Sequence, residues 1–459
     1  MKKKISIVLS LILALSLILS ACGQAENTDT DDSKDGTDEI TTDEDAETPV
    51  DEDEIKKISI LTSQGSYFEN QHGPMSEKMK ELYGYEIEWQ VLPDDQYYVL
   101  VKSKVATGEV PDIIEYNTPS NNIELNAHEK VVPLDDEPWV DRLVNPDLLA
   151  DPDDGKIYAQ PRESGTFFGG VYYNKSVLEE LGVSTEQPET MDELVERMHE
   201  VKDKSNGEIT PLYMSNAPAE GWTTQIFMTL GYSVYNYPND GEIYEQLLNN
   251  ELTFPEAPGF VEVLTQFKSF FEEGLVNEDH LSADYDSAQE AIGSGSAAMV
   301  FHGEWFPSLV NERYPETELG SWVIPYNDNL IMGTGAYVRG MFVMKDGDQV
   351  ETTLDFLDKW SQPEIQNIFY ETRPGFSAFN DVDGGEVDPS VTNLVENYLE
   401  TGKYTYQIND PMGVASSIWP ELWKLYADVL ASDREPIDIL EEWQVIYEDY
   451  MKQMEQPGF

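Results

Sequence analysis

Short apolar segments alternate with amphipathic helical patterns at the start of this chain's body, and that order constrains its fold more than any other feature. Residues 58–61 form a short apolar run, and residues 86–91 alternate polar and apolar side chains with the period of a strand. A helical stripe from Tyr97 to Val105 precedes a further strand candidate at 112–116. This strand–helix order predicts an α/β fold in which a parallel sheet has helices on both faces.

The rest of the body continues the alternation. Thr190 and Glu193 form a capping box, which predicts the start of a helix at that point. Residues 297–301 and 337–344 are strand candidates, and the pattern beyond 386 is almost entirely helical. No internal repeat of 20–50 residues is present, so a solenoid is not expected.

The charge of the chain excludes one class of partner. The 459 residues include 28 Lys+Arg and 89 Asp+Glu, which gives a formal net charge of −61. Phosphate backbones repel such a polyanion, so we expect no nucleic-acid partner. The same field disfavours anionic ligands unless the few arginines face the binding site.

The N-terminus has the pattern of a bacterial lipoprotein signal. Three lysines at positions 2–4 precede an apolar stretch that is shorter than the roughly 20 residues of a membrane-spanning helix. The following segment, residues 19–22, resembles a lipobox, in which Cys22 would carry the lipid. We therefore expect a signal peptide over 1–21 and a lipid anchor at the extracellular face of the cell membrane. An uncleaved anchor with an incidental cysteine is the alternative.

An acidic segment follows the cysteine. Fifteen acidic residues and one lysine lie between Ala25 and Glu54, and almost none of the others is apolar. Such a segment repels itself and has little to bury, which predicts a disordered tether over 22–55. Cys22 is the only cysteine, so neither a disulfide nor a cysteine metal cluster is expected.

Motifs for catalysis and for cofactors are missing or misplaced. The sequence contains no P-loop, no Gly-x-Ser-x-Gly elbow and no His-x-x-x-His pair. Residues 151–155 resemble the start of a calcium loop, but Arg162 stands where a bidentate glutamate is required, so a turn is expected. We therefore predict no enzyme activity, no metal and no cofactor.

A series of segments in a fixed order carries a resemblance to a known family. The segments are residues 110–114, 155–161, 172–175, 188–194 and 295–305. Together with the lipobox in front, they resemble the extracellular solute-binding proteins of ABC importers, in the sugar-binding branch that includes maltose-binding proteins. The resemblance extends over about residues 56–459.

This resemblance implies an α/β fold of two lobes, each a mainly parallel sheet flanked by helices, joined by a hinge that the chain crosses more than once. We expect lobe one to contain 56–162 plus 326–372, and lobe two 163–325 plus 373–459. The crossings are expected near 161–168, 323–325 and 373–376. The implied function is to capture a carbohydrate, an oligosaccharide, between the lobes and to deliver it to a membrane permease.

Tryptophans are the first candidates for contacts with a sugar, because the apolar C–H face of a sugar lies on aromatic rings. The resemblance places Trp305 where sugar binders of this family have a stacking tryptophan. Trp222 opens a helix after a loop, and Trp419 precedes Pro420 at a helix start. Core packing is the alternative for each of these residues, and Trp423 is expected to be core.

Polar candidates lie at a strand end and beside the hinge. Tyr116 and Asn117 end the strand at 112–116, where ligands of such sheets bind. Arg162 and Glu163 lie beside the first crossing and would bind hydroxyl groups or pair with each other across the hinge. Tyr337 and Arg373 complete the candidate set.

Two other functions stay open. A receptor for a peptide or a cationic solute would suit the negative charge of the chain. A secreted carbohydrate-active enzyme would need a defined pair of acidic residues, and no pair stands out among 89 acids.

Overall fold

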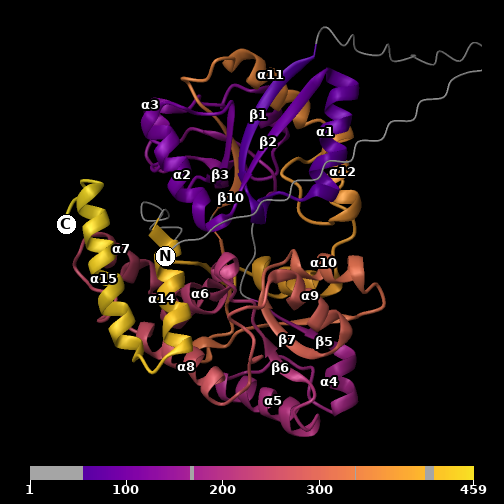
Figure 1. The fold of residues 1–459 in the computed structure, drawn as a ribbon, viewed down its shortest axis with the longest axis vertical. Helices are drawn as coiled ribbons and strands as arrows, with labels where there is room; N and C mark the ends of the chain where they lie inside the picture. The colour runs from indigo at the N-terminus through magenta and orange to yellow at the C-terminus, as the bar shows by residue number, and fades with distance from the viewer. Residues whose placement is uncertain (1–54, 166–169, 336, 409–417) are drawn as a thin grey trace, which may run out of the picture. The chain divides into compact units, whose positions relative to one another are not determined.

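The computed structural model describes residues 55–165, 170–335, 337–408 and 418–459, which form two α/β lobes (Figure 1). Among these residues, no helix combines the length and the apolar character that crossing a bilayer requires. The predicted signal peptide over 1–21, the lipid on Cys22 and the predicted tether up to residue 54 lie outside the described residues.

Lobe one is built around a five-stranded sheet of order β2-β1-β3-β10-β4. Its strands are β1 (Lys56–Ser63), β2 (Tyr85–Leu92), β3 (Ile113–Thr118), β4 (Ala159–Pro161) and β10 (Val338–Val343). Its helices are α1 (Glu69–Tyr83), α2 (Asp94–Thr107), α3 (Ala127–Lys130), α11 (Val350–Trp360) and α12 (Pro363–Thr372), with short 3₁₀ segments η2 (Gln64–Ser66), η3 (Pro138–Arg142) and η4 (Pro146–Leu149). Figure 1 shows α2 and α3 on one side of this sheet and α1 and α12 on the other.

Alternation along the strands divides the lobe-one core into two layers. Ile113 packs with Met75 and Phe356 on the face that α1 and α11 cover, whereas its neighbour Ile114 packs with Tyr97 under α2. Successive side chains of a strand point to opposite faces, so a buried strand needs apolar residues at both positions. The predicted helical stripe that starts at Tyr97 is buried, as expected.

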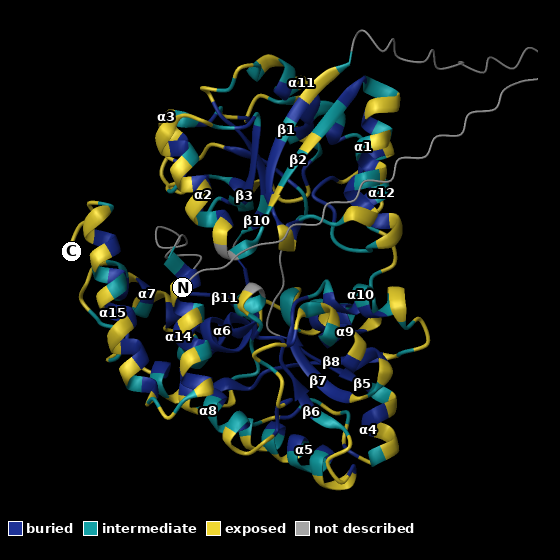
Figure 2. Ribbon diagram, in the orientation of Figure 1, coloured by how far each residue is buried: buried dark blue, intermediate teal, exposed yellow. Residues whose placement is uncertain are grey.

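Lobe two contains a four-stranded sheet of order β6-β7-β5-β8, whose inner strands are buried (Figure 2). Its strands are β5 (Gly170–Asn174), β6 (Thr210–Tyr213), β7 (Ala297–His302) and β8 (Leu319–Val323), and a separate pair is formed by β9 (Met332–Thr334) and β11 (Tyr404–Tyr406). Its first helices are α4 (Lys175–Leu181), α5 (Met191–Lys204), η5 (Pro218–Thr224), α6 (Gln225–Asn236), α7 (Asp240–Leu248) and α8 (Phe260–Glu272). They are followed by α9 (Tyr285–Ser294), α10 (Phe306–Arg313), η6 (Tyr326–Asp328), α13 (Pro389–Leu394), the π-helical η7 (Val395–Leu399), α14 (Trp419–Ala431) and α15 (Pro436–Gln453).

The predicted α/β class is confirmed, but the sheets are mixed and not mainly parallel. In lobe one, β1 is parallel to β2 and β3, while β10 is antiparallel to β3 and β4. In the four-stranded sheet of lobe two, β6 is parallel to β7, and β5 is antiparallel to both of its neighbours. Strands β5 and β10 each follow a crossing of the hinge, so each enters its sheet from the end at which the neighbouring strands finish.

The capping box at the start of α5 forms as predicted. The Thr190 hydroxyl oxygen accepts a hydrogen bond from the Glu193 backbone N–H at 3.2 Å, and the Glu193 carboxylate accepts one from the Glu189 N–H at 2.8 Å. The first bond satisfies an N–H group that the first turn of a helix leaves without a partner, and the second ties the residue before the N-cap to the same turn.

Two crossings between the lobes lie later in the chain than predicted. The Tyr326 hydroxyl donates to the Phe227 carbonyl of α6, and β9 pairs with β11, so the second crossing follows Thr334 and is not near 323–325. Residues 378–382 return to the lobe-one core through Phe379 and its neighbours, so the last crossing lies beyond the predicted 373–376. Proline and glycine punctuation in the sequence marks loops, but it does not show which core a short loop packs against.

Candidate ligand-binding site

Polar side chains meet at one edge of the lobe-one sheet, where β1, β3 and β4 end and β10 begins. Ser63 is the last residue of β1, Asn117 is the next to last of β3, and Arg162 follows β4. Arg339 is the second residue of β10. The carboxyl ends of parallel strands are the usual place for a ligand in an α/β sheet. The contacts of these side chains therefore decide whether they are available to a solute.

Arg339 connects three segments at this edge. Its Nε donates to the Ser66 hydroxyl at 2.7 Å, its Nη2 to the Ser63 hydroxyl at 2.8 Å and its Nη1 to Asn117 Oδ1 at 3.2 Å. The predicted contact residue Asn117 thus has its amide oxygen engaged by the protein. Its neighbour Tyr116 is 1% exposed and donates its hydroxyl to Glu124 at 3.0 Å, so the structure places Tyr116 in the core.

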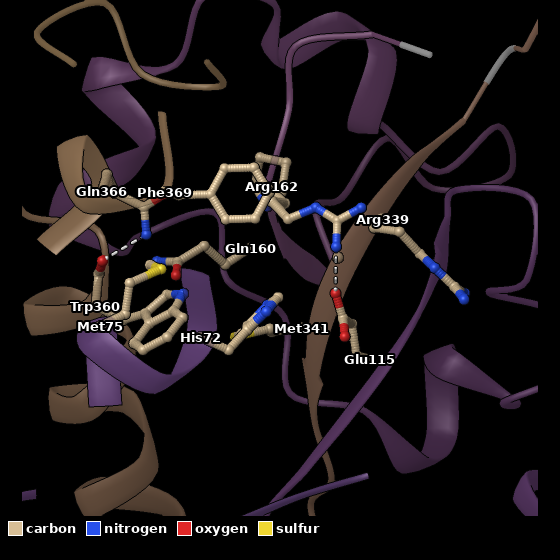
Figure 3. Close-up of a pocket in the computed structure, with 12 residues that line it drawn as sticks. His72, Met75, Glu115, Gln160, Arg162, Arg339, Met341, Trp360, Gln366 and Phe369 are labelled. Carbon is tan, nitrogen blue, oxygen red and sulfur yellow. Dashed lines mark hydrogen bonds and ion pairs between the residues drawn. The ribbon is translucent and has the colours of Figure 1, made fainter. Parts of the chain in front are cut away.

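Arg162, whose guanidinium faces Glu115 in Figure 3, also pairs with Glu163 at the end of β4. Arg162 Nε donates to Glu163 Oε2 at 2.7 Å, and its Nη1 donates to Glu115 Oε1 at 3.3 Å. Glu115 is 2% exposed and also accepts from the Thr62 hydroxyl. Burial lowers the pKa of Arg162, but the charges of Glu163 and Glu115 outweigh it and hold that pKa above its ordinary value. The cavity beside this pair measures about 10 Å³, which is room for about one water.

Lobe two contains a cluster of four aromatic rings, which belong to Trp222, Tyr285, His302 and Trp305. The Trp222 ring centroid lies 6.2 Å from that of Trp305, 5.8 Å from that of Tyr285 and 5.6 Å from that of His302. These residues come from η5, the start of α10, the start of α9 and the end of β7. The structure therefore brings the predicted Trp222 and Trp305 together, and both are only partly buried.

Glycine at position 303 permits this arrangement. A Cβ atom built on Gly303 would lie 2.3 Å from the Trp305 ring, so the indole lies directly over the backbone at this residue. The Gly303 N–H also donates to His302 Nδ1 at 2.8 Å. His302 Nε2 is buried without a hydrogen-bond partner, and burial lowers the pKa of this histidine to about 3.

Arg373 follows α12 and lies against an aromatic ring of lobe one. Its Cζ is 3.7 Å from the centroid of Phe68, and its Nη1 is buried without a hydrogen-bond partner among the residues that the structure describes. Burial, and then the positive charge of Arg162, lower the pKa of Arg373 to about 10. Tyr337 lies just before β10 and packs, partly buried, against the lobe-two core.

The two tryptophans on α14 differ in burial from what the sequence indicated. Trp419 is 3% exposed and its ring lies 5.4 Å from that of Trp443 in the lobe-two core. Trp423, which was expected to be core, is only partly buried and lies 6.4 Å from Tyr98 of lobe one. The buried stripe of α14 includes Trp419 and Leu422, and Trp423 lies at its margin.

Sequence reasoning missed several residues of this region. His302 closes a predicted strand three residues before Trp305, which is a usable signal for its position. Phe68, Tyr285 and Arg339 carry no comparable signal, because their neighbours come from distant parts of the chain.

One group of described side chains has the composition of a metal site. Ligand atoms of His128, Asp151 and Asp153 lie within 4.8 Å of one another. The Asp151 carboxylate is already engaged by the Asn122 amide at 2.8 Å and by the Asp153 N–H at 3.0 Å. The Gly155 N–H donates to the Asp151 carbonyl at 2.8 Å, so this segment is the turn that the sequence predicts.

Comparison with known proteins identifies relatives over most of the chain. The family described as bacterial extracellular solute-binding protein matches residues 70–367. The chain is 22% identical over 372 residues to the melibiose/raffinose/stachyose-binding protein MelE of Bacillus subtilis, covering 80% of this chain and 83% of that protein.

Solved structures have the same fold. A sugar transporter from Bacillus licheniformis in complex with stachyose matches with a TM-score of 0.71 at 20% identity, over 86% of this chain and 100% of that one. The solute-binding protein RafE in complex with raffinose matches with a TM-score of 0.69 at 18% identity, over 86% of this chain and 99% of that one. At these identities the likeness establishes the two-lobed fold.

Proposed function

Because this chain belongs to the family of bacterial extracellular solute-binding proteins, we propose that it captures an oligosaccharide between its two lobes for an ABC importer. The name of its relative MelE and the sugars held by the two structural neighbours support a carbohydrate as the solute. The solute leaves the protein chemically unchanged, because the task is binding and delivery to the permease.

The pair of partly buried tryptophans in lobe two is the observation that carries this proposal. Trp222 and Trp305 lie 6.2 Å apart with 41° between their ring planes, and the Trp222 indole N–H is held by Glu220 at 3.0 Å. Aromatic rings held in place offer flat apolar surface for the C–H faces of sugar rings, and carboxylates accept hydrogen bonds from sugar hydroxyls. Burial raises the pKa of Glu220, as expected for a carboxylate beside these rings.

Capture couples to closure of the hinge. A solute that contacts both lobes binds the closed form more tightly than the open form, and this difference in affinity shifts the equilibrium towards closure. The permease would then recognise the surface of the closed form.

The protein acts outside the cell and is held there by lipid. Removal of the signal peptide over 1–21 would leave Cys22 as the lipidated N-terminus, with the acidic segment as a spacer. Replacement of Cys22 by alanine should release the protein from the membrane fraction into the medium.

Isothermal titration calorimetry of the full chain with raffinose and stachyose tests the function. Trp222→Ala or Trp305→Ala should weaken binding by about 1–3 kcal/mol, because each removes a ring from the contact. Trp89→Ala provides the control, since this partly buried indole lies in lobe one and donates to Ser76. Cleavage of the sugar in the same sample, or binding of cationic peptides alone, would contradict the proposal.

A further inference from the structure

Two arginines lie against the same pair of aromatic rings at the end of α12. Arg162 Cζ is 5.9 Å from the centroid of Phe68 and 5.7 Å from that of Phe369. The corresponding distances for Arg373 are 3.7 and 6.0 Å. Two guanidinium groups beside the same rings repel each other, and a site that holds both must supply negative charge.

The carboxylates of Glu163 and Glu115 form their direct bonds to a guanidinium with Arg162. Glu163 binds Arg162 Nε through one oxygen and accepts the Arg339 backbone N–H with the other at 3.0 Å. Glu115 is shared between Arg162 and the Thr62 hydroxyl. Both carboxylates are therefore engaged by groups other than Arg373.

Arg373 has no such partner. Within the described part of the chain its side chain forms neither a hydrogen bond nor an ion pair, and its Nη1 is buried. Glu163 and Glu304 act on it only through space, and Glu304 acts more weakly than Glu163. Burying a charge without a hydrogen-bonded counter-charge is costly, so native structures normally provide a partner.

Arg373 lies near groups of the candidate site in both lobes. Tyr285, a member of the ring cluster with Trp222, also acts electrostatically on Arg373. Arg162, which lies against the same two rings as Arg373, follows β4 at the sheet edge where ligands of α/β folds bind, so the unpaired guanidinium lies at that edge. The planar fork of a guanidinium matches the two oxygens of a carboxylate, and a single arginine can select this group in a chain of net charge −61.

We infer that Arg373 binds a carboxylate of the solute, so that the captured carbohydrate is an acidic oligosaccharide that contains a uronic acid. This inference rests on the proposed function, since it names the class of sugar bound at the same site.

Calorimetry with three trisaccharides tests it on the full chain. The probes are trigalacturonate, its uncharged methyl ester and raffinose. The acid should bind at least about 10-fold more tightly than its ester, as expected for a charge-assisted contact. Arg373→Gln should weaken the acid at least about 30-fold and change the affinity for the ester or raffinose by less than about 3-fold. Arg313→Gln, which alters an exposed arginine paired with Asp286 at 3.1 Å, should leave all three affinities unchanged.

The outcomes separate this inference from the proposed function. Equal affinity for the acid and its ester, or an equal loss for acid and raffinose in Arg373→Gln, would overturn the inference and leave the function standing. Failure of all three sugars to bind would overturn both. Arg373→Met tests whether Arg373 has a purely structural role. Without ligand, the melting temperature of this variant should equal or exceed that of the wild type. A fall of several degrees would show that Arg373 has a partner inside the protein and would overturn the inference.

Discussion

The two lobes present opposite kinds of surface to the region between them. At the lobe-one edge, Arg339, Arg162 and Glu163 are bound to other groups of the protein. In lobe two, Trp222 and Trp305 are partly buried rings held in place by neighbouring rings. The difference teaches that charged residues at strand ends can be engaged within the protein: here Arg162 and Glu163 pair with each other, while Trp222 and Trp305 are the proposed surface for a solute.

Removal of a charge from the lobe-one edge should have the largest effect. Arg162→Met removes the cation that pairs with buried Glu115 and partly buried Glu163, so the free energy of unfolding should fall by about 3–5 kcal/mol. Equilibrium denaturation in urea measures this change. Arg434→Met is the control, because Arg434 pairs with Asp428 and Glu442 at the surface and its loss should cost about 1 kcal/mol or less. A similar cost for the two variants would break the comparison between the lobes.

Acid should lower the free energy of unfolding through the ring cluster of lobe two, by less than Arg162→Met does. The pKa of folded His302 is about 3, whereas the ordinary value is 6.5. Between these pH values the unfolded chain binds a proton that the folded chain does not, so the free energy of unfolding falls as the pH falls and is fully retained above about pH 6.5. At pH 5 the loss from this group should be about 2 kcal/mol.

Substitution of the histidine isolates this contribution. His302→Phe keeps a ring in the cluster, so its stability should fall less than that of the wild type between pH 7 and 5. His72, whose pKa burial also lowers to about 3, and His280, whose pKa burial also lowers, remain in the variant and contribute to the pH dependence that is left. A slope equal to that of the wild type would show that His302 does not titrate in this range.

The smallest effect on stability is expected from a substitution at Gly303, whose backbone lies under the Trp305 ring. Gly303→Ala places a methyl group where the indole now lies, and the ring at the end of its side chain can move away. Stability should therefore change little, whereas the affinity for raffinose should fall by about 1–2 kcal/mol because the stacking surface is displaced. Calorimetry and thermal unfolding on the same sample compare the two effects. A large loss of stability with unchanged affinity would assign Trp305 to the core.

Local patterns in the sequence predicted the elements of the fold well. The capping box of α5 and the strands β7 and β10 lie where their patterns indicated, because such signals depend on residues near one another in the chain. Trp222 and Trp305 were also among the candidates, and the structure brings them together. Predictions failed where a distant partner decided the outcome, as for Trp419, which packs on Trp443 of a later helix.

The sequence by itself determined the α/β class, the acidic character of the chain and the family to which it belongs, because periodicity, charge and ordered segments can be read without coordinates. Only the tertiary structure decided the direction of β5 and β10, the points at which the chain crosses between lobes, and which arginine is left without a partner. Those properties depend on contacts between residues far apart in the chain: Arg162 bonds to Glu115 from another strand, while Arg373 lies over the ring of Phe68.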